Sequence, residues 1–244
     1  CGITGVGRLP EPEAIVDWLE AKMCSTNELE GTTILVTAGG TQESIDPVRY
    51  IGNRSSGKMG YAIAEQAAHM GAKVILVSAP TSLPIPSGVD FISVDSAVSM
   101  QEAVEARYND VNVVIMAAAV SDFRVLHKAE QKIKKMESMT IELVKNPDIL
   151  QGLGSKKSHQ ILVGFAAETE HVIKYGQDKV AKKNLDMLVA NDVSKSNAGF
   201  NVDTNEGYFL YPDKEPKEMP NMKKSELARH ILREVIDLVA NKHS

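Results

Sequence analysis

Polar side chains come directly after several apolar runs of this chain, at the point where each run ends. They are Ser121 and Asp122, Glu168 and Thr169, and Asn191 and Asp192. An earlier apolar run ends at Gly39 and Gly40. Because the carboxyl ends of parallel strands meet at one edge of a sheet, where open α/β sheets bind their ligands, the sequence predicts one polar cleft at this edge.

The loop after Gly40 is suited to an anionic ligand. It is far longer than the usual connection of about 2–6 residues, and it leads into a helix that we expect to begin near Ser56 and Gly57. Glycines let the backbone approach a phosphate, and the free N–H groups of a helix start point toward it. The polar residues of this loop are Arg49, Asn53, Arg54, Ser55 and Ser56.

Two groups of lysines could offset the charge of such a ligand. Lys132, Lys134 and Lys135 cluster in one polar segment, whereas Lys179 and Lys183 stand four residues apart and share a helix face. A solvated surface position is the commoner explanation for any single lysine. The helix of Lys179 and Lys183 follows a strand end, which favours a place at the cleft.

Small residues and a turn complete the predicted cleft. Ala117–Ala119 follow a strand directly and would allow close approach of a flat or phosphorylated ligand, although tight packing explains them equally well. Asn146 or Asp148 could cap a helix in the segment KNPDIL, whose free N–H groups could also hold a phosphate.

Strand and helix patterns alternate from Thr32 onward, which predicts an α/β fold with a Rossmann-like, doubly wound, mostly parallel sheet. The expected strands are Ile34–Thr37, Lys73–Ser78, Asp90–Val94, Val111–Ala117, Ile161–Phe165 and Asp186–Ala190. The expected helices are Gly57–Met70, Ala97–Tyr108, His171–Lys183 and Lys223–Asn241. Residues 121–145 interrupt the alternation and predict a Lys-rich flap. Residues 194–222 are expected to be irregular, with one possible strand at Gly207–Tyr211.

Composition limits the class of protein. The chain is 43% hydrophobic and 24% charged, as in an ordinary globular protein, and its net charge of −5 argues against a nucleic-acid partner. Cys1 and Cys24 are too few for a disulfide framework. We find no apolar run of about 20 residues and no signal peptide, so we expect no membrane partner and a cytoplasmic location. Residues 1–30 are rich in Gly and Pro, with one possible short helix at Glu13–Met23.

Several familiar motifs are incomplete. GGTQES lacks the spacing of a dinucleotide fingerprint, and no acidic residue follows KVILVSAPTS to hold a ribose. SSGK at Ser55–Lys58 lacks the first glycine of a Walker A loop, and the pair Tyr175 and Lys179 is attributed to chance. A dinucleotide-dependent oxidoreductase and a regulator that only binds a nucleotide remain alternatives to a ligase.

The chain contains six separated motifs in a fixed order: DPVRYIGNRSSGKMG, MAAAVSDF, KIKK, KNPDIL, VGFAAET and DMLVAND. Together they resemble the bacterial phosphopantothenoylcysteine synthetase family, which forms the synthetase half of a bifunctional coenzyme A biosynthesis enzyme. The resemblance runs from about Thr32 to at least Tyr211. One departure is Ser121-Asp122-Phe123, where family members often have Ala-Asp-Trp.

The first residues resemble the end of the flavin-dependent decarboxylase that precedes the synthetase in that family. Cys1 matches its proton-donor cysteine, so residues 1–30 are expected to be a decarboxylase tail and linker and residues 31–244 the synthetase domain. Cys1 would be inactive here, and FMN would belong only to the missing decarboxylase domain.

The resemblance implies a ligase that joins 4′-phosphopantothenate to L-cysteine through an acyl-cytidylate made from CTP, with Mg²⁺, in a homodimer. It assigns catalysis to Asn53 and Lys132, and phosphopantothenate binding to Arg49 and Asn53. It assigns nucleotide binding to Met116, Ala117, Ala118, Asp122, Lys132, Asn146, Pro147, Asp148, Ile149, Phe165, Lys179 and Lys183. Asp122 would also contact the metal. How cysteine is bound and why CTP is chosen over ATP stay open.

Overall fold

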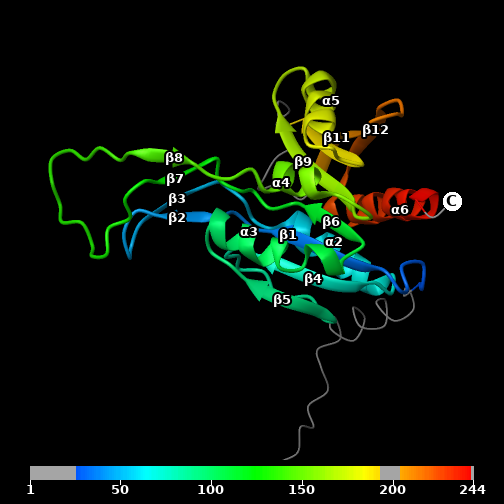
Figure 1. The fold of residues 1–244 in the computed structure, drawn as a ribbon, viewed down its shortest axis with the longest axis horizontal. Helices are drawn as coiled ribbons and strands as arrows, with labels where there is room; N and C mark the ends of the chain where they lie inside the picture. The colour runs from blue at the N-terminus through cyan, green and yellow to red at the C-terminus, as the bar shows by residue number, and fades with distance from the viewer. Residues whose placement is uncertain (1–25, 193–203, 243–244) are drawn as a thin grey trace, which may run out of the picture.

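An eight-stranded sheet with helices on both faces forms the body of the protein (Figure 1). The structure is a computed structural model that describes residues 26–192 and 204–242. Cys1 and the expected helix Glu13–Met23 lie outside the described residues. The strand order is β12-β11-β10-β9-β6-β1-β4-β5, and the six strands from β10 to β5 run parallel. The predicted α/β, mostly parallel, doubly wound fold is therefore confirmed.

The parallel strands form where the sequence is continuously apolar, as expected for strands covered on both faces. They are β1 (Thr33–Ala38), β4 (Lys73–Ser78), β5 (Val89–Ser93), β6 (Val113–Met116), β9 (Ile161–Glu168) and β10 (Met187–Asp192). The helices are α2 (Lys58–His69), α3 (Ala97–Glu105), α4 (Ile149–Lys156), α5 (Val172–Lys182) and α6 (Lys224–Lys242), with a short 3₁₀ helix at Tyr108–Asp110.

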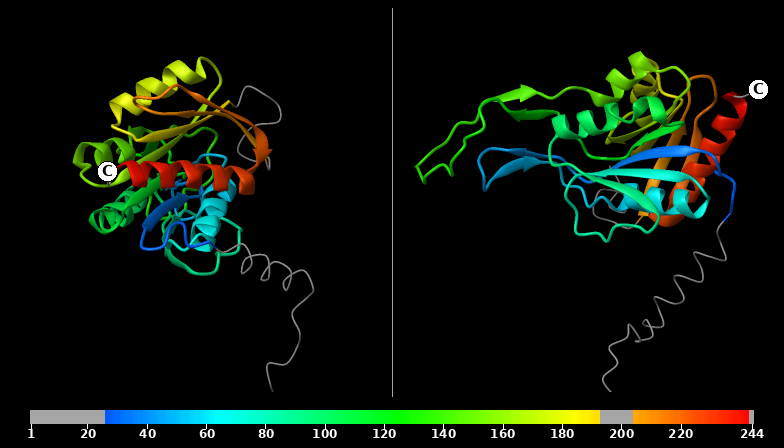
Figure 2. Two further views of the ribbon diagram at one scale, coloured as in Figure 1. Left: turned by 90° about the vertical axis from the view of Figure 1, so that its right-hand side faces the viewer. Right: turned by 60° about the horizontal axis from the view of Figure 1, so that its bottom comes forward.

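Two apolar layers hold the helices to the sheet. Alternate residues of β1 point to opposite faces, so that Val36 packs with α2 and α6, whereas Leu35 packs with α3, α4 and α5. Figure 2 shows the helices on the two sides of the sheet. Among residues 26–30, Leu29 is buried and its N–H donates to Met70 O, so this segment packs on the end of α2.

The strand order reverses between β1 and β6. After β1 the chain forms β4 and β5 on one side of β1. The next parallel strand, β6, lies on the other side of β1. In open α/β sheets such a topological switch point opens a crevice at the carboxyl ends of the two strands. Gly39 and Gly40 follow β1, and Ala117 follows β6, so both segments lie at this crevice.

In the described part of residues 194–222, the possible strand predicted at Gly207–Tyr211 is present with shifted bounds, whereas the expectation of irregular structure is wrong for the residues around it. Strands β11 (Thr204–Leu210) and β12 (Lys217–Lys223) extend the sheet as an antiparallel pair. The pattern of β12 hides this because it is an edge strand: within it only Met219 is buried, and Pro220 is tolerated where no ladder partner is needed.

Two short antiparallel hairpins project from the carboxyl edge of the sheet and form an arm (Figure 1). One hairpin pairs β2 (Gln42–Ser44) with β3 (Tyr50–Gly52), and the other pairs β7 (Phe123–Val125) with β8 (Leu143–Lys145). The predicted Lys-rich flap is the loop of this second hairpin. We use the name arm for residues 42–52 and 123–145.

No helix among the residues that the structure describes is long and apolar enough to cross a membrane.

Candidate active site

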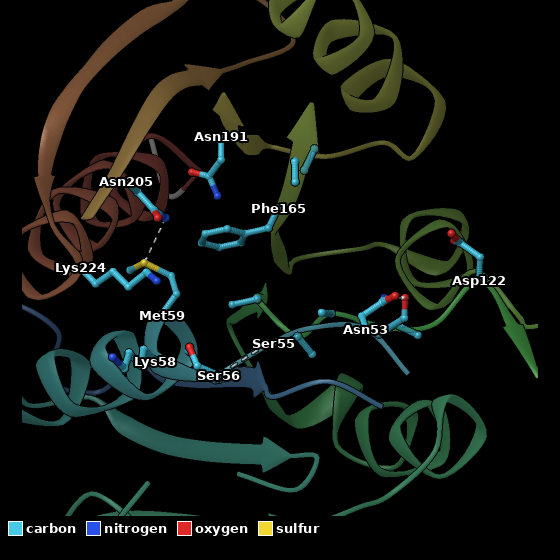
Figure 3. A pocket seen from close by; sticks show the side chains of 18 of the residues that line it. Asn53, Ser55, Ser56, Lys58, Met59, Asp122, Phe165, Asn191, Asn205 and Lys224 are labelled. Atoms are coloured by element: carbon cyan, nitrogen blue, oxygen red, sulfur yellow. Dashed lines mark hydrogen bonds between the residues drawn. The ribbon is translucent and has the colours of Figure 1, made fainter. Parts of the chain in front are cut away.

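Two adjoining cavities lie at the switch point and form one cleft. The larger has a volume of about 330 Å³ and the smaller about 230 Å³. Residues that line both are Ala118, Val120, Asp122 and Phe165. In Figure 3 the Phe165 ring lies between Asn191 and Asn205 at one end of the larger cavity and Asn53 and Asp122 at the other. Of the polar groups predicted at the strand ends, Ser121, Asp122 and Asn191 line this cleft, whereas Glu168, Thr169 and Asp192 line neither cavity.

Close packing of glycines brings the backbone to the floor of this cleft. Gly39 has a φ of 79°, and a Cβ there would lie 2.7 Å from Ala79 O. A Cβ on Gly60 would lie 2.6 Å from Ala38 Cβ, so α2 can approach β1 only because this residue is glycine. The start of α2 is thereby held at the carboxyl end of β1, where its first N–H groups are available to an anion.

The segment after β6 is fixed by hydrogen bonds that it donates to the end of β1 and to the loop that follows β1. Thr37 Oγ1 accepts from Ala118 N at 3.1 Å, and the buried Thr41 Oγ1 accepts from Ser121 N at 2.9 Å. Ala119 N donates to Gly39 O at 2.8 Å. These bonds fix the backbone of residues 117–121 along the cleft.

Two asparagines extend this framework. Asn53 Nδ2 donates to Val120 O at 3.2 Å, which places its amide over the segment after β6. The buried Asn146 donates through Nδ2 to Ser121 O at 2.8 Å, and its backbone N–H donates to Asp122 O at 2.8 Å. Asn146 is therefore engaged in holding the cleft wall, whereas Asn53 is an exposed amide at the larger cavity.

The two predicted cleft lysines are both paired with carboxylates. Lys179 Nζ lies 2.5 Å from Glu168 Oε1, and Lys183 Nζ lies 2.9 Å from Asp148 Oδ2. Asp148 also caps α4 by accepting from Gln151 N at 3.0 Å. Partial burial raises the pKa of the Asp148 carboxyl, but the hydrogen bonds from Lys183 and Gln151 outweigh it and bring this pKa below its usual value.

Most of the predicted nucleotide-binding residues line the cleft. Lys179 and Ala117 line the larger cavity, whereas Met116, Asn146, Pro147, Asp148, Ile149 and Lys183 line the smaller one. The shared residues Ala118, Asp122 and Phe165 join the two sets. Residues from five separate parts of the chain therefore meet in one place.

Arg49 and Lys132 do not line either cavity. Arg49 lies in the arm, where its Nη2 donates to Asp46 Oδ2 at 2.6 Å and to Ile133 O at 2.8 Å. Lys132 is exposed and precedes Ile133 directly. Arg49 and the backbone next to Lys132 are therefore in contact within the arm. Neither residue belongs to the set that lines the cleft.

Several residues of the larger cavity have no place in the sequence-based assignment. Ser55 and Ser56 belong to the loop that composition singles out, and Asn191 follows a strand. Lys58, Asn205 and Lys224 carry no comparable signal, because they come from a helix start, the part of β11 that precedes the predicted strand Gly207–Tyr211, and the start of α6. The Asn191 Oδ1 atom is buried and has no hydrogen-bond partner among the described residues.

A buried amide oxygen without a partner costs about 1–3 kcal/mol, so Asn191 favours a ligand with an N–H or O–H group at this end of the cavity. A second polar group there is Asn205, whose Nδ2 lies 3.9 Å from Met59 Sδ.

Metal-binding potential in the cleft rests on Asp122. No cluster of three or more His, Cys, Asp or Glu that could hold a metal ion occurs in residues 26–192 and 204–242. Asp122 is an exposed carboxylate that lines both cavities. Because Mg²⁺ commonly uses one or two carboxylates together with substrate phosphates, the single Asp122 carboxylate would suit this ion where a bound ligand supplies phosphate oxygens.

The protein-family model for the "DNA/pantothenate metabolism flavoprotein C-terminal domain" matches residues 29–239. The "Coenzyme A biosynthesis bifunctional protein CoaBC" of Bacillus subtilis (strain 168) is 48% identical over 242 residues, which are 98% of this chain and 60% of that protein. The protein of the same name from Escherichia coli (strain K12) is 45% identical, over 97% of this chain and 59% of that protein. The chain thus spans about three-fifths of the length of these relatives.

A solved structure of the C-terminal domain of a coenzyme A biosynthesis bifunctional protein CoaBC has a TM-score of 0.77 and 44% identity, covering 88% of this chain and 100% of the solved chain. The sequence match over residues 29–239 includes every strand of the sheet and every described residue of the cleft. The chain therefore belongs to the family of the DNA/pantothenate metabolism flavoprotein C-terminal domain.

Proposed function

We propose that the protein is a CTP-dependent ligase that joins 4′-phosphopantothenate to L-cysteine. The carboxylate of phosphopantothenate attacks the α-phosphate of CTP, and an acyl-cytidylate forms as pyrophosphate leaves. The cysteine amine then attacks the acyl carbon, CMP leaves, and an amide is produced. The reaction belongs to coenzyme A biosynthesis, in agreement with the names of the relatives.

One observation carries the proposal: residues predicted for CTP and for the acyl intermediate line one cleft. Asn53, Asp122, Phe165 and Lys179 come from four separate parts of the sequence and share the larger cavity. A dinucleotide-binding protein would require an acidic residue at the end of β4 to bind the ribose. This chain has Ser78 and Ala79 at that position.

CTP is proposed to lie across the junction of the two cavities. The flat Phe165 ring can pack against the base, and Lys179 and Lys183 can exchange their present carboxylate partners for phosphate oxygens. The first step brings a carboxylate toward a polyanion, so that lysine ammonium groups and the N–H groups at the start of α2 must stabilise the growing charge.

The acyl end of phosphopantothenate is proposed to lie beside Asn53. Its amide N–H groups can donate to the acyl oxygen and polarise the carbonyl when the cysteine amine attacks. The Oδ1 of Asn191, which has no hydrogen-bond partner among the residues that the structure describes, can accept a hydrogen bond from a substrate N–H or O–H group at the other end of the cavity. Enclosure by the cleft would keep water from the acyl-cytidylate.

A Mg²⁺ ion bound with CTP would be held by Asp122 and by phosphate oxygens. The ion would supply charge neutralisation of the triphosphate. Asp122 would orient the bound nucleotide from a position shared by both cavities.

The working form is proposed to be a homodimer. The arm exposes large apolar side chains that a monomer would leave in water, among them Tyr50 at 55%, Phe123 at 51% and Leu143 at 44% exposure. A second copy that covers this surface could also bring Arg49 and Lys132 of one protomer to the cleft of its partner. This arrangement would give both residues the roles that the resemblance assigns to them.

The wider setting rests on the relatives. Their bifunctional names and their greater length agree with a preceding decarboxylase domain that carries FMN, of which Cys1 and the first 30 residues would be the end. Use of CTP as a substrate implies a cytoplasmic location.

The proposal is tested by pyrophosphate release from the purified protein. Release should require phosphopantothenate, CTP and Mg²⁺ together, and the amide product should require cysteine as well. NADPH serves as the competing ligand in a thermal-shift assay. Pyrophosphate release without phosphopantothenate, or stabilisation by NADPH and not by CTP, would contradict a ligase.

A further inference from the structure

Asp46 is a deeply buried carboxylate within the otherwise exposed arm. Its side chain is 0% exposed, although Val48, two residues later, is 62% exposed. Burial of a charge in such a small element is unfavourable unless hydrogen bonds compensate for the lost water. The contacts of Asp46 therefore show what this carboxylate holds in place.

Both oxygens of Asp46 are fully used. Oδ1 accepts from Val48 N and from Arg49 N, each at 2.8 Å. Oδ2 accepts from Arg49 Nε at 3.0 Å, from Arg49 Nη2 at 2.6 Å and from Ile133 N at 3.0 Å. The Arg49 hydrogen bond outweighs desolvation and, with the three backbone donors, holds the pKa of Asp46 well below its usual range. The carboxylate is ionised throughout the neutral pH range.

These contacts join the two hairpins of the arm. Ile133 belongs to the flap, 87 residues after Asp46, and it follows Lys132 directly. Arg49 Nη2 donates to Ile133 O at 2.8 Å, and Ala129 N donates to Ile45 O at 2.9 Å. The Asp46 carboxylate thus binds both the guanidinium of Arg49 and the backbone N–H of Ile133, the residue after Lys132.

Arg49 keeps capacity for a ligand in this arrangement. A guanidinium has five N–H donors, and the contacts above occupy Nε and Nη2. The Nη1 donors have no partner among the described residues, and the side chain is 40% exposed. Because Asp46 accepts from Nε and Nη2, it fixes the orientation of the guanidinium and leaves the Nη1 donors for an anionic substrate.

We infer that Asp46 is a positioning residue for the ligase reaction, which sets the guanidinium of Arg49 and the segment of Lys132 for an anionic substrate. The inference rests on the proposed function for its substrate, phosphopantothenate, and on the described contacts for its geometry. Asp46 itself does not contact the substrate, because both of its oxygens are occupied within the arm.

The test compares Asp46→Asn with Asp186→Asn in the full chain. Asp186 is a matched control, since its carboxylate also accepts from a backbone N–H, Leu162 N at 2.7 Å, and pairs with Lys157 at 3.2 Å, outside the arm and the cleft. Asp46→Asn should raise the KM for phosphopantothenate about tenfold or more, as expected for loss of a charged fork, and Asp186→Asn should leave it unchanged.

A double-mutant cycle separates positioning from general stability. Arg49→Lys keeps the charge and loses the fork, so Asp46→Asn should have almost no further effect on KM in that background. Full additivity of the two effects, or a lower Tm with an unchanged KM, would overturn the inference.

Hydrogen exchange supplies a readout that is independent of activity. Amides of residues 126–142 should exchange faster in Asp46→Asn than in the wild-type protein, and not in Asp186→Asn. An unchanged exchange rate would contradict the positioning of the flap by Asp46. A wild-type protein that releases no pyrophosphate would instead contradict the proposed function, and the exchange result would still decide whether Asp46 fixes the arm.

Discussion

The chemistry of this cleft depends on a few amide and ammonium groups set against a rigid backbone. Asn53 donates to Val120 O, within the segment whose backbone N–H groups donate to the hydroxyl oxygens of Thr37 and Thr41. An amide in this position can move its donor from a backbone carbonyl to a substrate acyl oxygen with little rearrangement. The carboxylate partners of Lys179 and Lys183 hold each ammonium at the cleft, where, in the proposed reaction, the phosphates of CTP would replace them.

Asn53→Asp tests the role of this amide. Replacement of a donor by a carboxylate should leave acyl-cytidylate formation measurable and slow amide formation about 100-fold, the cost of one lost donor to a developing oxyanion. Quenched-flow chromatography should show the acyl-cytidylate accumulating. Asn109→Asp, at an exposed position in the 3₁₀ helix, is the control and should behave as wild type. An unchanged steady-state rate in Asn53→Asp would remove Asn53 from the mechanism.

At the scale of elements, two helix starts border the cleft and are held there in different ways. The start of α2 approaches β1 through glycines, whereas α4 begins at Asp148, whose side chain accepts from Gln151 N and pairs with Lys183. Each helix start is thus placed by residues that also line a cavity. Stability and ligand binding are therefore coupled at both positions.

Asp148 should contribute to stability in a pH-dependent way. Its folded-state pKa lies below that of the unfolded chain, near 3.9, so the contribution is present above about pH 4 and is lost as the pH falls through the folded-state value. Asp148→Ala also removes the helix cap and should lower the free energy of unfolding by about 1 kcal/mol. Urea titrations at pH 7 and pH 3 measure both effects.

Asp148→Asn separates these two contributions, because asparagine still caps a helix but carries no charge. It should be less stable than the wild type at pH 7, and this difference in stability should become smaller at pH 3, as the wild-type carboxylate becomes protonated. A difference that does not depend on pH would contradict the pairing with Lys183.

Gly60→Ala should push α2 away from β1. The added Cβ would lie 2.6 Å from Ala38 Cβ and 2.8 Å from Thr37 O, so the free energy of unfolding should fall by about 1–3 kcal/mol. Gly152→Ala in α4 is the control, since no atom lies within 4 Å of its added Cβ. This control should be neutral or up to about 1 kcal/mol more stable. If Gly60→Ala and Gly152→Ala change the free energy of unfolding equally in urea denaturation, close contact between α2 and β1 at Gly60 is contradicted.

At the scale of the whole molecule, the sheet body carries the cleft and the arm carries Arg49 and Lys132. The body is covered on both faces, but the arm exposes apolar side chains on both hairpins. Exposed apolar side chains of this kind favour association with a second copy of the chain. The proposed homodimer would bury these side chains and combine the two sets of residues.

Tyr50→Glu tests this assembly. A charge at this 55% exposed position of β3 should dissociate the dimer and lower activity, because charged groups are unfavourable in an apolar interface. Ile85→Glu, at a 53% exposed position outside the arm, is the matched control and should not change the molar mass of the assembly in solution. Light scattering after size exclusion gives the mass directly. A wild-type monomer, or a dimer that tolerates Tyr50→Glu, would contradict an interface through the arm.

Periodicity of apolar residues predicted the parallel strands and helices α2, α3, α5 and α6, since buried strands and amphipathic helices leave strong patterns, whereas α4 was indicated only by the possible capping residues in KNPDIL. It missed β12, whose single buried residue is Met219, and the arm hairpins, whose three-residue strands are too short to show a period. The polar residues after each strand predicted the cleft edge. Lys224 and Asn205 reach the larger cavity only through the antiparallel extension of the sheet and α6, which no local motif encodes.

The path of one oxygen atom tests the central claim most directly. If the phosphopantothenate carboxylate attacks the α-phosphate of CTP, a carboxylate labelled with ¹⁸O must pass one labelled oxygen to CMP when cysteine displaces it. Mass spectrometry of the products should therefore show CMP with a single ¹⁸O atom and unlabelled pyrophosphate. Unlabelled CMP, or label in pyrophosphate or phosphate, would contradict an acyl-cytidylate and with it the proposed ligase mechanism.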